Sequence, residues 1–307
     1  MVQYFPMNRP LIVDAPTSES QRVSLRWEST DGSSDVVGHV IAANTDWVVV
    51  LPQDRPAVWV PQSEARNLRR VPERTVLPTS SADSLQRILD RTWPGTRRAR
   101  LGGWILRDGP DDSFRANSVL ASGDPGVEFT EALRLAREWQ GGPVRLQVVI
   151  GSDAQARGRA AGMKLSKLTR TMTLAIDDRW AVETPDAAID DAPNEAWLEL
   201  WEHRGNDARV AEMTAAPATY LRLGDHAIGR IAYFGGWGVL TDVEVARAAR
   251  GRGLGRDVTN ALIAHAARAG VRYLALQVEQ TNNIAVALYE SLGFTEHHRY
   301  GYLSEWA

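Results

Sequence analysis

The residues from Val239 to Gly270 join an apolar strand to a glycine-rich turn and then to an amphipathic helix. In the strand we expect Val239, Thr241, Val243 and Val245 to alternate along one face. Gly251, Gly253 and Gly255 let the backbone turn its N–H groups inward, because no Cβ atom obstructs them. The helix that follows adds its unpaired first-turn N–H groups and the positive end of its dipole to the same place. The pattern therefore predicts a nest that holds a pyrophosphate, and with it a coenzyme.

A second segment carries a similar but weaker pattern. Gln155-x-x-Gly158-x-Ala160 also follows an apolar strand, yet no amphipathic helix of useful length comes after it. The order strand, helix ending in glycine, strand occurs over both 144–176 and 271–303, which favours an internal duplication. Only the second copy keeps a phosphate cradle.

Composition excludes several kinds of site. The chain has no cysteine, so disulfides, thiolate metal sites and cysteine nucleophiles are ruled out. Its six histidines form no i, i+4 pair of the kind that binds a metal on a helix, and we expect no metal. A net charge of −3 argues against a nucleic-acid binder and suits a cationic partner better.

Length and composition predict a globular protein of 307 residues that is built from more than one structural unit. It has no apolar run of membrane-spanning length and no secretory-signal pattern at its start, so we expect a cytoplasmic protein without a membrane partner. Four segments are expected: a flexible arm over 1–20, a small SH3-like β-barrel over 21–77, an α/β unit over 78–181, and the unit with the cradle over 182–307.

Local patterns also predict the elements of the two later units. In the first we expect helices over 84–93 and 128–139, strands over 102–107, 114–122, 144–150 and 168–176, and a short helix ending at Gly162. In the second we expect a helix over 194–204, a hairpin turned at Gly224 and Asp225, a strand over 273–279, a helix over 282–293 and a strand over 294–303.

A second motif follows the cradle at a distance typical of one enzyme family. The segment RGRGLG after a strand, followed by N-x-x-A-x-x-x-Y-E-x-x-G-F from Asn282 to Phe294, resembles the GNAT N-acetyltransferases. The resemblance implies an α/β (α+β) GNAT fold with a mixed central sheet and flanking helices. Segments such as LTDVEV and HHRYGYL further resemble an actinobacterial subgroup with an SH3-like domain and a degenerate GNAT-like half before the catalytic GNAT domain. Arg247 stands where that subgroup commonly has proline.

The resemblance implies acetyl-CoA as cosubstrate and direct acetyl transfer to an amine of a small molecule or a protein (a lysine or the N-terminus). Backbone N–H groups would hold the pyrophosphate, with arginines supplying countercharge; the residues are Arg250, Gly251, Arg252, Gly253, Leu254, Gly255 and Arg256. The pantetheine arm would pair beside Val243 and Val245 as an added strand. Asn282 opens the last helix, and it serves as an N-cap, as a coenzyme contact, or as both.

The attacking amine must be neutral, so a base or a water chain is useful. Glu244 is the expected base and Asp242 the alternative; two residues apart on one strand, both should project from the same face. By resemblance, Tyr289 is the proton donor to the departing thiolate, and packing in the core is its alternative role.

Aromatic residues are expected near the acceptor. Trp197, Trp201, Tyr233 and Trp237 fall in segments that surround this region in the family, and Trp104 and Asn117 could close the cleft, although core packing is the favoured explanation for each. The leading hypothesis is an acetyl-CoA-dependent N-acetyltransferase, and the alternative is a non-catalytic acyl-CoA-binding sensor. The sequence leaves the acceptor and the oligomeric state open. A dinucleotide-dependent oxidoreductase is excluded, because no acidic residue ends the next strand in a position to hold a ribose.

Overall fold

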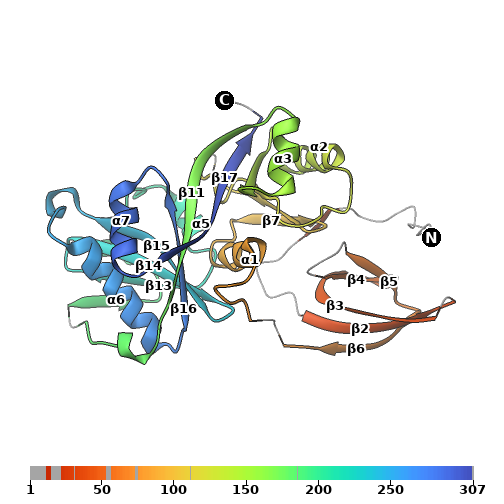
Figure 1. Ribbon diagram of the computed structural model, residues 1–307, viewed down its shortest axis with the longest axis horizontal. Coiled ribbons are helices and arrows are strands. Elements are labelled where there is room, and N and C mark those ends of the chain that lie inside the picture. The colour runs from red at the N-terminus through yellow and green to blue at the C-terminus, as the bar shows by residue number, and fades with distance from the viewer. Residues whose placement is uncertain are drawn as a thin grey trace.

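The computed structural model describes residues 12–14, 22–30, 32–52, 57–72, 75–110, 112–184 and 186–305. Its strands form a 12-stranded mixed sheet and a separate 5-stranded sheet, and helices flank the larger one (Figure 1). The predicted α/β fold with a mixed central sheet is confirmed. No helix in the described parts of the chain is both long and apolar enough to cross a membrane.

The small sheet is open. Its antiparallel strands follow the order β5-β4-β3-β2-β6 around a core that includes Val23, Leu25 and Val50. Within the described residues β5 and β6 do not pair, so the SH3-like barrel predicted over 21–77 is not confirmed. The alternating pattern specifies only one buried face, and an open, curled sheet buries that face too. The strands are β2 (Arg22–Ser29), β3 (Gly32–Ala43), β4 (Trp47–Leu51), β5 (Val58–Pro61) and β6 (Ala65–Arg70).

The start of the chain contributes a strand to the large sheet. Residues Ile12–Asp14 form β1, which pairs antiparallel with β7 through Ile12 and Leu101. The expected flexible arm over 1–20 is therefore wrong for these residues, and the rest of that range lies outside the described residues. A segment without sequence periodicity is ordered here by an available sheet edge, which local patterns do not reveal.

The first half of the large sheet follows the predicted order of elements with one exception. The segment expected as a strand over 114–122 is mostly turns, because Ser113 Oγ accepts the N–H of Ala116 and stabilises a local turn instead. The elements are α1 (Ala82–Thr92), β7 (Arg97–Leu101), β8 (Trp104–Asp108), β9 (Val119–Leu120), α2 (Phe129–Gln140), β10 (Arg145–Val149), α3 (Asp153–Ala160) and β11 (Lys164–Ala175).

The second half departs from prediction at its start. The helix expected over 194–204 ends after one turn, and Asn206 caps an additional helix, α5, that the sequence did not suggest. The elements are η1 (Asp178–Trp180), β12 (Ala187–Asp190), α4 (Glu195–Leu198), α5 (Asp207–Met213), β13 (Ala218–Leu223), β14 (Ala227–Phe234), β15 (Trp237–Val245), η2 (Arg247–Ala249), α6 (Leu254–Arg268), β16 (Tyr273–Glu279), α7 (Asn283–Ser291) and β17 (Thr295–Ser304).

The two halves exchange their last strands. The sheet order runs β10-β17-β11-β16, so β17 of the second half lies between β10 and β11, and β11 of the first half lies between β17 and β16. These two long strands run side by side between the halves in Figure 1. Both copies of the predicted repeat fold as strand, helix and strand, and each completes the other's sheet.

Helices cover opposite faces of the second half. Helices α6 and α7 pack on the face that carries Leu240 and Leu274, where Val258 and Leu262 of α6 are fully buried. Helix α1 packs on the other face, over Val239 and Ala275. Neighbouring strand residues point to opposite faces, so these contacts assign the side chains of β16, and those of β15 as far as Leu240, to one face or the other.

Candidate active site

Strands β15 and β16 separate halfway along their length. They pair in parallel from Trp237 with Tyr273 to Leu240 with Leu276, and no pair follows. Beyond this point β15 stays bonded to β14 and β16 stays bonded to β11, so a wedge with two unpaired strand edges opens between them. We call this the wedge. An extended chain entering it would find free backbone N–H and C=O groups on both sides.

A bulge in β15 lies at the mouth of the wedge. Arg230 pairs with Thr241 and Ile228 with Glu244, so Asp242 and Val243 together oppose Gly229. Asp242 has a φ of 50°, which is uncommon for a residue other than glycine.

The bulge changes which side chains share a face. Val243 and Val245 pack against the core under α6, whereas Val239 packs under α1. The expectation that these three valines alternate along one face is therefore wrong, because the extra residue shifts the alternation by one. Glu244 is paired with Ile228, whose side chain lies on the α1 face, so Glu244 faces the same side.

The glycine-rich turn has the backbone geometry expected of a cradle, and its binding of a phosphate remains a prediction. Gly251 and Gly253 have φ values of 77° and 86°, the left-handed region that favours glycine, and Gly253 caps α6 without a side-chain hydrogen bond. Within the described residues, no acceptor is found for the backbone N–H groups from Arg252 to Gly255. Gly255 lies in the first turn of α6, where a Cβ atom would contact Leu288 of α7 at 3.4 Å. The geometry suits an anion.

The three arginines of the turn have different surroundings. Arg250 Nε donates to the carbonyl of Val245 at 3.1 Å and holds the turn against the end of β15. Arg256 Nη2 donates to Ser291 Oγ of α7 at 2.7 Å. Arg252 is exposed and has no partner among the described residues. Its guanidinium therefore needs no existing contact broken before it can approach a phosphate.

Glu244 has the electrostatics of a general base. Burial, followed by the nearby carboxylates of Glu202 and Asp242, raises the pKa of Glu244 to about 8. Its Oε2 accepts the backbone N–H of Glu202 at 2.9 Å. The Trp201 indole donates to Asp242 Oδ1 at 3.1 Å. The structure thus places both candidate carboxylates on one face, as predicted, beside a segment after α4 whose role was not predicted.

Tyr289 and Asn282 lie on α7. The ring of Tyr289 is 9% exposed and packs edge-on against Phe294, and burial raises its pKa to about 12. It therefore keeps its proton at neutral pH. The Asn282 side chain accepts the N–H of Ala285, which confirms the predicted N-cap. The catalytic and coenzyme-binding roles of these residues remain predictions.

The aromatic candidates divide between the two faces. Trp197 and Trp201 lie on the face of the sheet that carries Glu244, which we call the acceptor face, and the Trp201 indole contacts Asp242 there. Tyr233 packs with the core under α6, and Trp237 lies under α1 with its N–H bonded to the carbonyl of Val76.

Neither cleft-closing candidate of the first half is confirmed. Trp104 is 1% exposed in that half's core, which confirms the favoured role of core packing over a place at the cleft. Asn117 remains partly exposed, and its carbonyl accepts from Arg145. Core packing, the simpler role, thus explains Trp104.

Two residues of the site were not predicted. Glu202 contacts Glu244 through its backbone and raises the pKa of that carboxyl through its charge. Gln277 lies on β16 one position past Leu276, the last residue of β16 that pairs with β15. The only sequence signal for Gln277 is the tripeptide Leu-Gln-Val, which occurs in both copies of the repeat.

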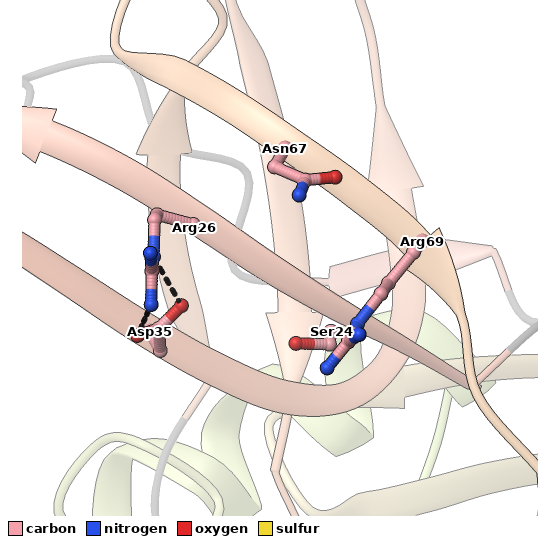
Figure 2. Close-up of a pocket in the computed structure, with 5 residues that line it drawn as sticks. All are labelled: Ser24, Arg26, Asp35, Asn67 and Arg69. Atoms are coloured by element: carbon pink, nitrogen blue, oxygen red, sulfur yellow. Dashed lines mark hydrogen bonds and ion pairs between the residues drawn. The ribbon is translucent and has the colours of Figure 1, made fainter.

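A pocket elsewhere carries none of the candidate residues. Figure 2 shows Ser24, Arg26, Asp35, Asn67 and Arg69 lining a pocket of about 160 Å³ on the small sheet. Its Arg26 and Asp35 side chains form a paired hydrogen-bonded ion pair at 2.9 and 3.0 Å, so much of its charge is already neutralised. Among the described residues no three histidine, aspartate or glutamate side chains gather to hold a metal ion, and the expected absence of a metal remains a prediction.

Comparisons with known proteins agree with the fold. The family described as "Probable histone acetyltransferase Rv0428c C-terminal" matches residues 79–303. The "Uncharacterized N-acetyltransferase YobR" of Bacillus subtilis is 27% identical over 237 residues, which cover 70% of this chain and 96% of that protein. The "Probable histone acetyltransferase Rv0428c" of Mycobacterium tuberculosis is 26% identical over 302 residues, which cover 92% and 94%.

One solved structure shares the fold. The GCN5-related N-acetyltransferase from Kribbella flavida superimposes with a TM-score of 0.53 at 16% identity, over 75% of this chain and 97% of that one. At this identity the likeness concerns architecture alone.

Proposed function

Since the chain belongs to the family of the Rv0428c C-terminal region, and so to the GNAT acetyltransferases, we propose that it transfers an acetyl group from acetyl-CoA directly to an amine. Residues 182–307 form the catalytic half, and residues 78–181 form a degenerate half. The observation that carries the proposal is the adjacency of an open amide cradle, a wedge between two strands, and a carboxylate with a raised pKa at the mouth of that wedge.

The cradle and the wedge bind different parts of the coenzyme. The N–H groups from Arg252 to Gly255 bind the pyrophosphate, and the exposed guanidinium of Arg252 adds countercharge. The pantetheine arm lies along the unpaired edge of β15 beside Val243 and Val245, where it acts as an added strand. This arrangement uses backbone groups that the protein itself leaves without partners.

Glu244 acts as the general base and Tyr289 as the general acid. Glu244 removes a proton from the acceptor ammonium or amine, and the neutral nitrogen forms a C–N bond to the thioester carbon. The C–S bond breaks, and the departing sulfur takes a proton from Tyr289, which its buried position keeps protonated. The new amide nitrogen loses its second proton, which restores the hydroxyl of Tyr289. A base with a pKa of about 8 is well matched to an amine at physiological pH.

The acceptor is an amine that carries positive charge in solution. The carboxylates of Glu202, Asp242 and Glu244 lie together on the acceptor face and attract such a group before it is deprotonated. A lysine or N-terminal amine of a protein and a small cationic amine both fit this description. The name of the M. tuberculosis relative makes lysine-rich proteins a first choice for testing.

An acceptor screen tests the proposal. The protein is incubated with acetyl-CoA and a panel of diamines, amino acids, peptides with free N-termini and lysine-rich proteins, and thiol release and product mass are measured. We expect acetylated product from at least one class, formed more slowly at acidic pH. Saturable binding of acetyl-CoA without product from any class would contradict catalysis and favour a coenzyme sensor.

A further inference from the structure

Gln277 carries a buried side-chain amide whose hydrogen-bonding capacity is unused. Both Oε1 and Nε2 are shielded from solvent and have no partner among the described residues. The side chain projects from β16 to the same face as Ala275, which is the face that carries Glu244. The residue also lies directly past Leu276, the last β16 residue that pairs with β15. An unused donor and an unused acceptor therefore sit at the closed end of the wedge.

The first half contains a structural counterpart of this residue. Gln147 precedes Asp153, the first residue of α3, by the same six positions that separate Gln277 from Asn283, the first residue of α7. Each glutamine stands between leucine and valine. Each also pairs with the exchanged strand of the other half, Gln147 with Tyr302 and Gln277 with Thr171.

The two glutamines differ in their partners. Gln147 Nε2 donates to Gln86 Oε1 at 2.8 Å, and its Oε1 accepts from Arg107 Nη2 at 2.6 Å. In the half that lacks a cradle, the protein thus satisfies both ends of the amide. In the half that has one, it satisfies neither. A buried polar group without a partner destabilises the folded state, so the Gln277 amide is available to hydrogen-bond a ligand, whereas the Gln147 amide is already engaged.

We propose that Gln277 is a catalytic residue that contacts both reactants at the closed end of the wedge. Its Oε1 accepts a hydrogen bond from the attacking amine, which orients the nitrogen lone pair toward the thioester carbon. Its Nε2 donates to the thioester carbonyl oxygen, where negative charge develops as the C–N bond forms. The inference rests on the proposed acetyl transfer and adds to it a residue on β16, opposite the carboxylates of β15.

Two substitutions separate the two ends of the amide. Gln277→Leu removes both hydrogen-bonding groups, so the KM for the amine rises and kcat falls by about 10²-fold, the usual cost of losing a donor to a developing oxyanion. Gln277→Glu keeps an oxygen for the amine but loses the donor, so kcat falls while the KM for the amine stays near that of the wild type. The Kd for coenzyme A, which lacks the acetyl group, stays the same in both variants.

Thermal unfolding distinguishes this role from a structural one. Because a leucine side chain at this position leaves no polar atom unsatisfied, we expect Gln277→Leu to unfold at the same or a higher temperature than the wild type. Gln147→Leu is the matched control. It leaves the buried Gln86 Oε1 without its donor and removes one acceptor from Arg107 Nη2. The variant therefore unfolds at a lower temperature, while the fraction that remains folded turns over at the wild-type rate.

The outcomes are distinct. Wild-type kcat and KM in both Gln277 variants would overturn the inference and leave the proposed function standing, and so would a loss of stability in Gln277→Leu equal to that of Gln147→Leu. A crystal structure of the coenzyme complex in which a water molecule joins Gln277 to other protein groups would also overturn it. If the wild type itself shows no acetyl transfer to any amine, the proposed function fails and the inference fails with it.

Discussion

The loops that precede α2 and α6 occupy comparable places in the two halves, and among the described residues only in the first does a side chain cap one of the loop N–H groups. Before α2, Gly123 and Gly126 adopt positive φ values of 84° and 79°, much as Gly251 and Gly253 do before α6. However, Asp124 accepts the N–H of Gly126 through its side chain at 2.7 Å. Before α6, the N–H groups have no such partner in the described structure. Glycine thus permits an anion site, but only unsatisfied amides make one.

Buried charge shows the same contrast. Asp90 of α1 is fully buried and pairs with Arg98 at 2.6 Å and Arg107 at 3.4 Å. Burial alone would raise the pKa of Asp90, but the two guanidinium groups hold it below its usual value. Glu244 has carboxylates for neighbours instead, and its pKa is raised. One half uses its ionisable groups to close its core, and the other leaves them poised for proton transfer.

Substitution of the expected base gives the largest predicted effect on rate. Glu244→Gln keeps the size of the side chain but cannot take a proton, so we expect kcat/KM for the amine to fall by about 10²- to 10⁴-fold. The coenzyme affinity stays the same, as measured by calorimetry. Glu131→Gln on α2 of the first half is the control and retains full activity. Equal rates for the two variants would place the base elsewhere.

Substitution of Asp90 tests the structural half of the contrast. Asp90→Asn leaves two buried arginines without their carboxylate, so the free energy of unfolding falls by about 3–5 kcal/mol in denaturant titrations. Asp108→Asn breaks only the half-exposed pair with Arg97 and costs about 1 kcal/mol or less. A loss for Asp90→Asn no larger than that of the control would show that the buried network does not stabilise the first half.

Matched glycine substitutions compare the two loops directly. Gly253→Asp introduces a side chain at a φ of 86° and a negative charge beside the open amides, so acetyl-CoA binds about 10- to 100-fold more weakly in calorimetry. Gly126→Asp imposes a similar backbone strain at a φ of 79° in the first half and leaves the affinity unchanged. If both variants lose affinity equally, the effect arises from folding and not from the cradle.

The smallest predicted effect is a shift of the pH profile. Glu244 acts as a base only when it is deprotonated, so kcat/KM of the wild type rises as the pH increases through about 8. Glu202→Gln removes a neighbouring negative charge, which lowers the pKa of Glu244 and moves this rise to lower pH. Rate profiles at constant ionic strength measure the shift. A shift to higher pH, or none, would show that Glu202 does not act on the base.

Elements that depend on local pattern could be predicted from the sequence. The hairpin at Gly224 and Asp225, the strand over 273–279 and the helix after the cradle all fold as expected, because alternation and helical spacing are properties of neighbouring residues. The shared face of Asp242 and Glu244 also follows from local pattern, and the coenzyme-binding role of the glycine-rich turn stays a prediction.

Features that depend on pairing between distant parts of the chain could not be predicted from the sequence. The exchange of β11 and β17 joins strands far apart in the chain, and the pairing of β1 depends on a sheet edge that forms elsewhere. The bulge at Asp242 requires a positive φ, and the presence of an aspartate in a strand does not predict one. Gln277 is noticed only when its side-chain amide, which has no hydrogen-bond partner among the described residues, is compared with that of Gln147, which has partners at both ends. Such differences belong to tertiary structure and leave no trace in composition or periodicity.

A crystal structure of the full chain with coenzyme A tests the central claim most directly. The account predicts the pyrophosphate within hydrogen-bonding distance of the N–H groups from Arg252 to Gly255, and the pantetheine arm between β15 and β16 beyond Leu240. Density for the coenzyme at the loop before α2, at the pocket of the small sheet, or at no position under saturating ligand would contradict it.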